Sequence, residues 1–107
     1  MAAKVKVANF DEAVQEIRRR VTASKNFDAR VRFTFDDGKT YLVDGHTTPP
    51  SFDEGGTNNE DVTLTMGSDI FIKITNGELI APVAMATGKV KAKGNLMKAM
   101  SLSKVLD

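Results

Sequence analysis

Few side chains in this sequence are able to do chemistry. The 107 residues include no cysteine and one histidine, His46. The lack of cysteine excludes disulfides, thiolate metal ligands and a cysteine nucleophile, and a single histidine excludes a multi-histidine metal cluster. His46 lies in a Gly-His-Thr-Thr-Pro-Pro segment with no recognisable nucleophile motif near it, so we interpret it as a loop residue rather than a general base. We therefore expect a protein that is not an enzyme and has no catalytic residue, cofactor or metal.

Two pairs of adjacent carboxylates are the other candidates for acid–base chemistry. They are Asp36-Asp37 and Asp53-Glu54, and each pair lies beside a glycine. Acidic residues next to glycine are typical of turns, where they are solvated. We interpret both pairs as turn residues.

Lysines dominate the charge near the end of the chain. Lys89, Lys91 and Lys93 alternate along a predicted strand, and Lys98 and Lys104 follow with no acidic residue before Asp107. Three interpretations stay open: a solvated sheet face, contact with an anionic lipid or a CoA phosphate, and nucleic-acid binding. The last is disfavoured because no aromatic residue interleaves these lysines to stack on bases. The whole chain has 15 basic and 14 acidic residues, so its net charge gives no long-range attraction to DNA or to an anionic membrane.

Hydrophobic periodicity predicts the elements that would position these residues. Residues 10–22 have the spacing of an amphipathic helix with Asn9 as its cap, and we interpret the arginines at 18–20 as its solvated end rather than as a phosphate-binding patch. Residues 29–36, 61–66 and 89–93 alternate between apolar and polar side chains, and Asp37-Gly38 predicts a hairpin turn to a strand at 39–44. The shared apolar face predicts an antiparallel sheet that is covered on one side.

Two segments leave alternatives open. Residues 45–60 form either a mobile functional loop or, by a slight preference, a loop that contains a short edge strand near 51–53. In residues 68–76 the alternating isoleucines and Asn76-Gly77 favour a strand and a turn, whereas Ser68 and Gly77 suit the start and end of a helix. Residues 95–106 have a helical pattern, with a wider apolar arc than one contact surface needs.

A family resemblance is carried by the second half of the chain. The quoted segments are Asp-Val-Thr-Leu-Thr-Met (61–66), Ser-Asp-Ile-Phe-Ile-Lys-Ile (68–74), Asn-Gly-Glu-Leu (76–79) and Ala-Thr-Gly-Lys-Val-Lys-Ala-Lys-Gly-Asn-Leu-Met-Lys-Ala-Met (86–100). Their order and spacing closely resemble the sterol carrier protein type-2 (sterol-binding) domain family. Over residues 10–45 only the order of elements is similar.

The resemblance implies an α+β fold: a five-stranded, mainly antiparallel sheet, helices covering one face, and an apolar ligand tunnel. It implies a single lipid-binding domain over residues 1–107 and a helix at 68–76. The apolar side chains that we expect to contact the ligand are Phe33, Phe35, Leu64, Phe71, Ile74, Ala84, Met85, Val90, Leu96, Met97 and Met100.

The function implied by this resemblance is non-enzymatic lipid binding and transfer. The expected ligand is a fatty acid, a fatty acyl-CoA, a sterol or a phospholipid, with transient contact to a membrane surface and no nucleic-acid partner. The chain has no apolar run of the roughly 20 residues that cross a bilayer and no apolar segment of a secretory signal, so we expect it in the cytoplasm. The alternative is an accessory interaction module whose apolar C-terminal helix docks onto a partner or a second copy.

Overall fold

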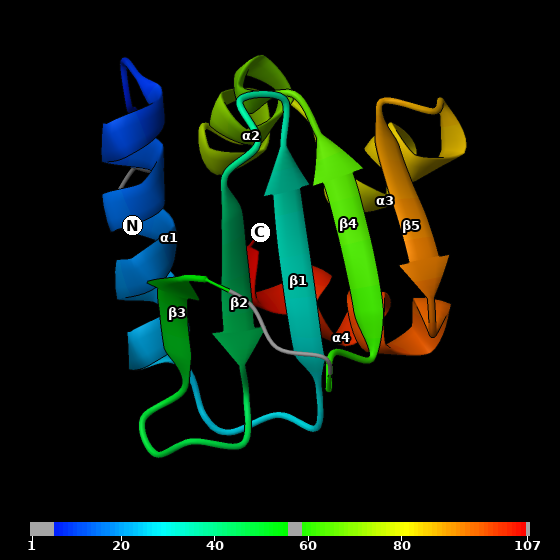
Figure 1. Cartoon of the computed structure of the whole chain (residues 1–107). Coiled ribbons are helices and arrows are strands. Elements are labelled where there is room, and N and C mark those ends of the chain that lie inside the picture. Colours follow the sequence, from blue (N-terminus) through cyan, green and yellow to red (C-terminus); the bar gives the residue numbers. More distant parts are fainter. Residues whose placement is uncertain (1–5, 56–58, 107) are drawn as a thin grey trace.

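A five-stranded sheet and four helices form the α+β fold of the computed structural model, which describes residues 6–55 and 59–106 (Figure 1). Along the sheet the strand order is β3-β2-β1-β4-β5. The elements in chain order are α1 (Phe10–Ala23), β1 (Arg30–Phe35), β2 (Thr40–Asp44), β3 (Ser51–Glu54), β4 (Val62–Met66), α2 (Ser68–Thr75), α3 (Ala81–Ala86), β5 (Val90–Gly94) and α4 (Leu96–Leu106).

The expected mainly antiparallel sheet is confirmed, with one parallel pair in the described sheet. β2 runs antiparallel to β1 and to β3, and β5 runs antiparallel to β4. The parallel pair is β1 with β4, in which Phe33 lies opposite Leu64. The hairpin turn at Asp37-Gly38 is also confirmed: the backbone N–H of Gly38, whose φ is 85°, donates to the carbonyl of Phe35 at 3.0 Å between the antiparallel strands β1 and β2. β3 and β5 are therefore the two edges of the sheet.

The alternation along the strands buries one face of the sheet, as the sequence predicts. Val31, Phe33 and Phe35 are buried in β1, and β4 has the same pattern. In β2, for which the sequence indicates no face, the buried residues are Tyr41 and Val43. Figure 1 shows α2, α3 and α4 behind the sheet and α1 beside β3.

A short edge strand occupies part of residues 45–60, so the slight preference for a strand is confirmed. β3 pairs with β2 so that Phe52 lies opposite Val43, and the Phe52 side chain is completely buried. The interpretation of Asp53-Glu54 as turn residues is wrong, because both belong to β3 and extend it toward Gly55. The physical reason is that the single apolar residue Phe52 anchors this strand in the core. Residues 56–58, also part of that segment, lie outside the described residues.

Residues 68–75 form a helix, as the family resemblance implies and against the alternation of their isoleucines. α2 buries Phe71, Ile74 and Thr75, whose spacing of three and four places them on one helical face. The backbone N–H of Ser68 donates to the carboxylate of Asp36 at 3.2 Å. After the helix, Gly77 has a φ of 74°, the left-handed conformation that commonly ends helices.

α1 begins as the sequence predicts, with Asn9 accepting a hydrogen bond from the backbone N–H of Glu12 at 2.9 Å. The interpretation of its arginines as a solvated end is wrong for Arg18 and Arg20, whereas the Arg19 side chain is 63% exposed. Arg18 donates to the carbonyl of Phe52 at 2.9 Å, and Arg20 donates to the carbonyl of Thr75 at 2.8 Å. These bonds tie α1 to β3 and to the end of α2.

A buried carboxylate holds two of these arginines in place. The Glu16 side chain, 7% exposed, accepts hydrogen bonds from Arg19 at 2.7 Å and from Arg20 at 2.8 Å. The Arg19 hydrogen bond, helped by Arg20 and opposed by burial, lowers the pKa of Glu16 from 4.5 to about 2. A lowered carboxylate pKa stabilises the folded state above the ordinary pKa, and that stabilisation is lost as the pH falls toward the folded value.

We predict that Glu16→Gln lowers the free energy of unfolding by about 2–3 kcal/mol at pH 7. The difference from the parent protein shrinks as the pH falls from 4.5 toward 2, because Glu16 then takes up its proton. Urea denaturation at pH 7, 5 and 3.5 measures this. The matched control is Glu54→Gln, at an exposed position, which we expect to change stability by less than about 0.5 kcal/mol. A Glu16→Gln difference that is constant over this pH range would contradict the role of the carboxylate.

Candidate functional site

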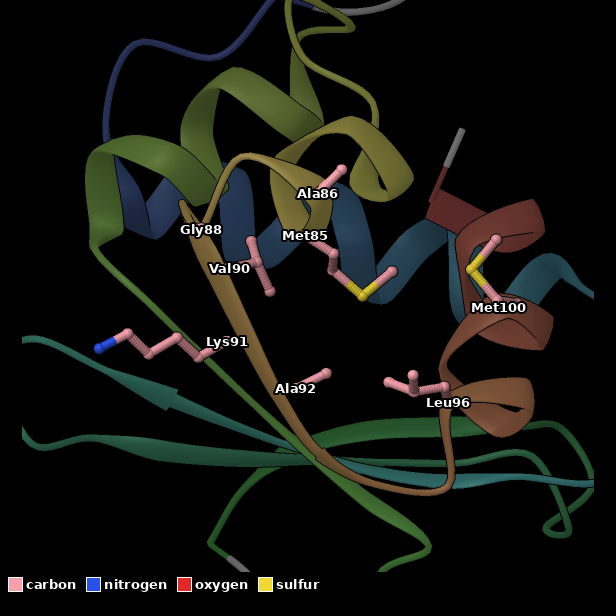
Figure 2. Close-up of a pocket in the computed structure, with 8 residues that line it drawn as sticks. All are labelled: Met85, Ala86, Gly88, Val90, Lys91, Ala92, Leu96 and Met100. Carbon is pink, nitrogen blue, oxygen red and sulfur yellow. The ribbon is translucent and has the colours of Figure 1, made fainter.

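An apolar pocket of about 580 Å³ lies between α3, β5 and α4. Its lining consists of Met85, Ala86, Gly88, Val90, Lys91, Ala92, Leu96 and Met100. Figure 2 shows the side chains of Met85, Ala92, Leu96 and Met100 around a common space, whereas the amino group of Lys91 points to the other side of β5. Among the lining residues there is no carboxylate, hydroxyl or imidazole group. Because the Lys91 amino group also points away, the pocket can hold an apolar group but directs no side chain for acid–base or nucleophilic chemistry at it.

Small and flexible residues create this space. Ala92, on the pocket face of β5, lies between the polar positions Lys91 and Lys93, so the strand presents one methyl group where a larger side chain would fill the gap. Met85 reaches into the pocket from α3, which is six residues long. Methionine adapts its shape through several rotatable bonds, so this wall can fit different apolar guests.

A glycine turns the chain from β5 into α4. Gly94 has a φ of 123°, and a β-carbon there would lie 2.6 Å from the carbonyl oxygen of Asp61. Asn95 follows and accepts a hydrogen bond from the backbone N–H of Met97 at 3.0 Å, which caps the start of α4. The tight turn places α4 directly beside the pocket.

α4 divides its apolar side chains between the core and the pocket. Ala99 and Leu102 are buried against the sheet, whereas Leu96 is 57% exposed and Met100 is 42% exposed. This division agrees with the expectation that so apolar a helix needs more than one contact surface.

The structure brings four of the eleven expected ligand-contacting residues together at the pocket: Met85, Val90, Leu96 and Met100. Six others are closed into the core, with exposed fractions of at most 3%: Phe33, Phe35, Leu64, Phe71, Ile74 and Ala84. Phe35 and Phe71 pack edge to face, with ring centroids 5.0 Å apart. The expected tunnel, which would connect the pocket with this core, stays a prediction.

Met97 lies outside the pocket, at the surface of α4. Its side chain is 80% exposed and borders a separate hollow of about 270 Å³, together with Met100, Ser101 and Lys104. Four lining residues were missed from the sequence: Ala86, Gly88, Lys91 and Ala92. Ala92 had a usable signal, because it alternates with the lysines and shares the strand face of Val90. The other three had none.

A polar cluster ties the start of α4 to the segment before β1. The Asp28 carboxylate contacts the Lys98 amino group at 2.7 Å and the His46 Nε2 atom at 2.8 Å. The Lys98 hydrogen bond, followed by that of His46, lowers the pKa of Asp28 from 3.8 to about 2. Lys98 also donates to the backbone carbonyl of Asp28 at 2.7 Å. Because Leu96 and Met100 lie on the same helix, this cluster helps to set the position of one pocket wall.

The surroundings of His46 do not form a catalytic triad. Its Nδ1 atom lies 3.3 Å from the carboxylate of Asp44, and its Nε2 atom contacts Asp28. The ring is thus placed between two carboxylates, and within the described residues no hydroxyl group is hydrogen-bonded to it. In residues 6–55 and 59–106 no group of three acidic or histidine side chains is arranged to hold a metal ion. No helix in this part of the chain has the length and apolar character of a membrane span.

Comparisons with known proteins match this fold and sequence. The model of the SCP-2 sterol transfer family matches residues 10–107. Non-specific lipid-transfer protein-like 1 of Caenorhabditis elegans is 29% identical over 105 residues, which cover 91% of this chain and 89% of that protein. Hydroxysteroid dehydrogenase-like protein 2 of Bos taurus is 32% identical over 73 residues, which cover 67% of this chain and 18% of that protein. This chain therefore matches less than a fifth of that longer relative.

Among solved structures, Sterol Carrier Protein-2 from Aedes aegypti in complex with the C16 fatty acid palmitate superimposes with a TM-score of 0.71. The match covers 99% of this chain and 96% of that one, at 24% sequence identity. At this identity the likeness concerns the fold.

We predict that Lys98→Met raises the pKa of Asp28 from about 2 toward the ordinary aspartate value, because its largest stabilising partner is lost. We also expect faster amide hydrogen exchange in the first turn of α4. Carboxyl-carbon NMR titration and hydrogen exchange measure the two effects. Lys91→Met removes the same charge on the other side of β5 and is expected to leave both quantities unchanged; equal effects of the two variants would contradict a local role of Lys98.

Proposed function

This chain belongs to the SCP-2 sterol transfer family, and we propose that it binds the acyl chain of a lipid in the pocket between α3, β5 and α4. The observation that carries the proposal is the apolar lining of a space of about 580 Å³. Pockets for small apolar ligands have volumes of this order. We also propose that residues 1–107 act as a single lipid-binding domain.

The driving force is the removal of apolar surface from water. Each buried methylene of an acyl chain contributes about 0.8 kcal/mol. The same event covers the exposed parts of Leu96 and Met100, which gain contacts that the free protein lacks. Met85 and Met100 bring flexible thioether side chains from opposite walls, which suits a chain of variable length better than one rigid outline.

A long-chain fatty acid is the ligand we favour as a probe. The C. elegans relative is named for lipid transfer, and the Aedes aegypti relative was solved with palmitate. Fatty acyl-CoA, sterol and phospholipid remain alternatives for the natural ligand. We propose that Met85, Val90, Leu96 and Met100 contact the lipid directly. The six core residues of the expected set contact it only if α3 and α4 move apart to open a tunnel.

The proposed activity is binding and transfer without catalysis. Since the pocket lining has no carboxylate, hydroxyl or imidazole group and the amino group of Lys91 points to the other side of β5, a bound lipid meets no side chain that would react with it. His46, the single histidine, does not line this pocket. The match to the dehydrogenase-like relative covers 18% of that protein, so we do not propose a dehydrogenase activity for this chain.

Lipid extraction tests the proposal directly. We expect organic extraction of the natively purified protein, followed by mass spectrometry, to release an acyl lipid. Delipidated protein is expected to bind a fluorescent fatty acid that palmitate displaces. The proposal would be contradicted if the purified protein carried no lipid and the delipidated protein also failed to bind the fluorescent fatty acid.

Filling the pocket tests its location. Ala92→Phe places a ring in the space that Ala92 borders, and we predict at least about tenfold weaker binding of the fluorescent fatty acid, the equivalent of about two lost methylenes. The matched control is Lys93→Phe, which adds the same side chain to the same strand at an exposed position that does not line the pocket. We expect unchanged affinity for this control and an intact fold by circular dichroism for both. Unchanged affinity in Ala92→Phe would place the ligand elsewhere.

A further inference from the structure

Methionine supplies all the sulfur of this chain, because the sequence has five methionines and no cysteine. Three of them, Met85, Met97 and Met100, lie on the neighbouring helices α3 and α4. The other two are Met66, in β4, and Met1, which lies outside the described residues. A peroxide converts the methionine thioether into a sulfoxide, which makes a flexible apolar side chain polar. The oxidisable sulfur is thus gathered at the end of the molecule that contains the pocket.

The accessibility of the methionine side chains differs widely, and it determines how readily a peroxide in solution reaches each sulfur. Met97 is 80% exposed at the surface of α4, Met100 is 42% exposed, and Met66 is 5% exposed. Met85 is partly buried and packs against the core. We therefore expect Met97 to be oxidised first and Met100 and Met85 to follow, while Met66 stays reduced as long as the protein is folded.

Two of the accessible methionines line the pocket, and the third does not. Met85 and Met100 extend from α3 and α4 toward the same space, whereas Met97 borders the separate hollow on α4 (Figure 2). The lining has no hydroxyl, carboxylate or imidazole group, and the Lys91 amino group points to the other side of β5. No side chain of the lining would therefore donate a hydrogen bond to a sulfoxide oxygen. Such an oxygen needs water as its donor, and an incoming acyl chain would have to strip that water away at a cost in free energy.

We propose that Met85 and Met100 are redox-sensitive sites at which a hydroperoxide, by forming methionine sulfoxide, weakens the binding of lipid in this pocket. In this reaction a sulfur lone pair attacks one peroxide oxygen, so that an S–O bond forms while the O–O bond breaks. The other oxygen leaves as hydroxide or alkoxide and takes up the proton of the transferred oxygen, which gives water or an alcohol. The sulfur is oxidised by two electrons and the peroxide is reduced by two, without a protein acid, base or cofactor.

Lipid binding and oxidation oppose each other in this arrangement. An acyl chain that fills the pocket covers Met85 and the pocket side of Met100, so the empty protein is the form that a peroxide attacks more readily. Met97 lies outside the pocket and gains no such protection. Enzymes that reduce methionine sulfoxide reverse the modification, so the effect on binding is reversible. The inference rests on the proposed function and goes beyond it, because it concerns how that binding is regulated.

Peroxide footprinting tests the accessibility and the protection. Delipidated protein and protein saturated with palmitate are treated with hydrogen peroxide, and peptide mass spectrometry follows the sulfoxide at each methionine with time. We expect palmitate to slow the oxidation of Met100 and to leave that of Met97 unchanged. Met66 is the internal control for the fold and is expected to stay reduced in both samples. Equal rates of Met100 oxidation with and without palmitate would overturn the proposal.

Titration with the fluorescent fatty acid tests the effect on binding. We expect the parent protein to bind it at least about fivefold more weakly once Met85 and Met100 carry sulfoxide. Treatment with methionine sulfoxide reductases of both epimer specificities is expected to restore the binding. The double variant Met85→Leu/Met100→Leu keeps apolar side chains of similar size, and we compare its affinity only with its own affinity before peroxide. We expect no loss in this variant, whereas the matched control Met97→Leu is expected to lose as much affinity as the parent.

The outcomes separate this inference from the proposed function. An oxidised parent protein that binds as tightly as the reduced one would overturn the inference alone, as would a double variant that still loses affinity. A loss that accompanies sulfoxide at Met66 or a changed circular dichroism spectrum would also overturn it, because unfolding would then explain the loss. Failure of the reduced parent protein to bind the fatty acid would overturn the proposed function, and with it this inference.

Discussion

The apolar face of the sheet must be covered, and the way in which it is covered determines the rest of this structure. Toward β3 the cover is made of aromatic rings. Phe33 packs edge to face on Phe52 with ring centroids 5.8 Å apart, and Phe71 from α2 contacts the same cluster. Rings of this size fill the layer between sheet and helices, so this end of the molecule is a closed core. Toward β5 the strand contributes Val90 and Ala92, and the cover is the six-residue helix α3 together with α4. The pocket lies at this end because the side chains there are too small to fill the space between sheet and helices.

The same asymmetry extends to polar interactions. At the aromatic end, buried Glu16 and its arginines lock α1 against α2, and Arg18 holds β3. At the pocket end, α4 is tied at its first turn by an ion pair with Asp28, whose carboxylate is largely exposed. Exposed ion pairs contribute little to stability, whereas loss of a partner from a buried one is costly. One end of the molecule is therefore rigidly fixed, and the other is held by weaker interactions, which suits a region where a ligand enters and leaves.

Sequence reasoning was reliable where a local rule decides the outcome. The cap at Asn9, the turn at Asp37-Gly38 and the one-sided strands follow from residue type and alternation alone. The helical structure of α2 could be predicted only through the family resemblance. Its alternating isoleucines are equally compatible with a strand and with a helix that buries Phe71 and Ile74. The role of Arg20 could not be found, because one of its partners is a backbone carbonyl 55 residues away. Alternation also assigned Phe33 and Ala92 to the same face of the sheet without indicating that one lies in the packed core and the other beside a cavity.

The separation of the aromatic core from the pocket has a consequence for how such a protein can diversify. Substitutions at Ala92, Met85 or Met100 alter the shape of the cavity, and none of these residues belongs to the ring cluster that joins β1, β2 and α2. Selection can therefore change the size and character of the guest in small steps while folding remains intact. A cavity built at the edge of a sheet, rather than carved from its centre, makes ligand preference an evolutionarily adjustable property.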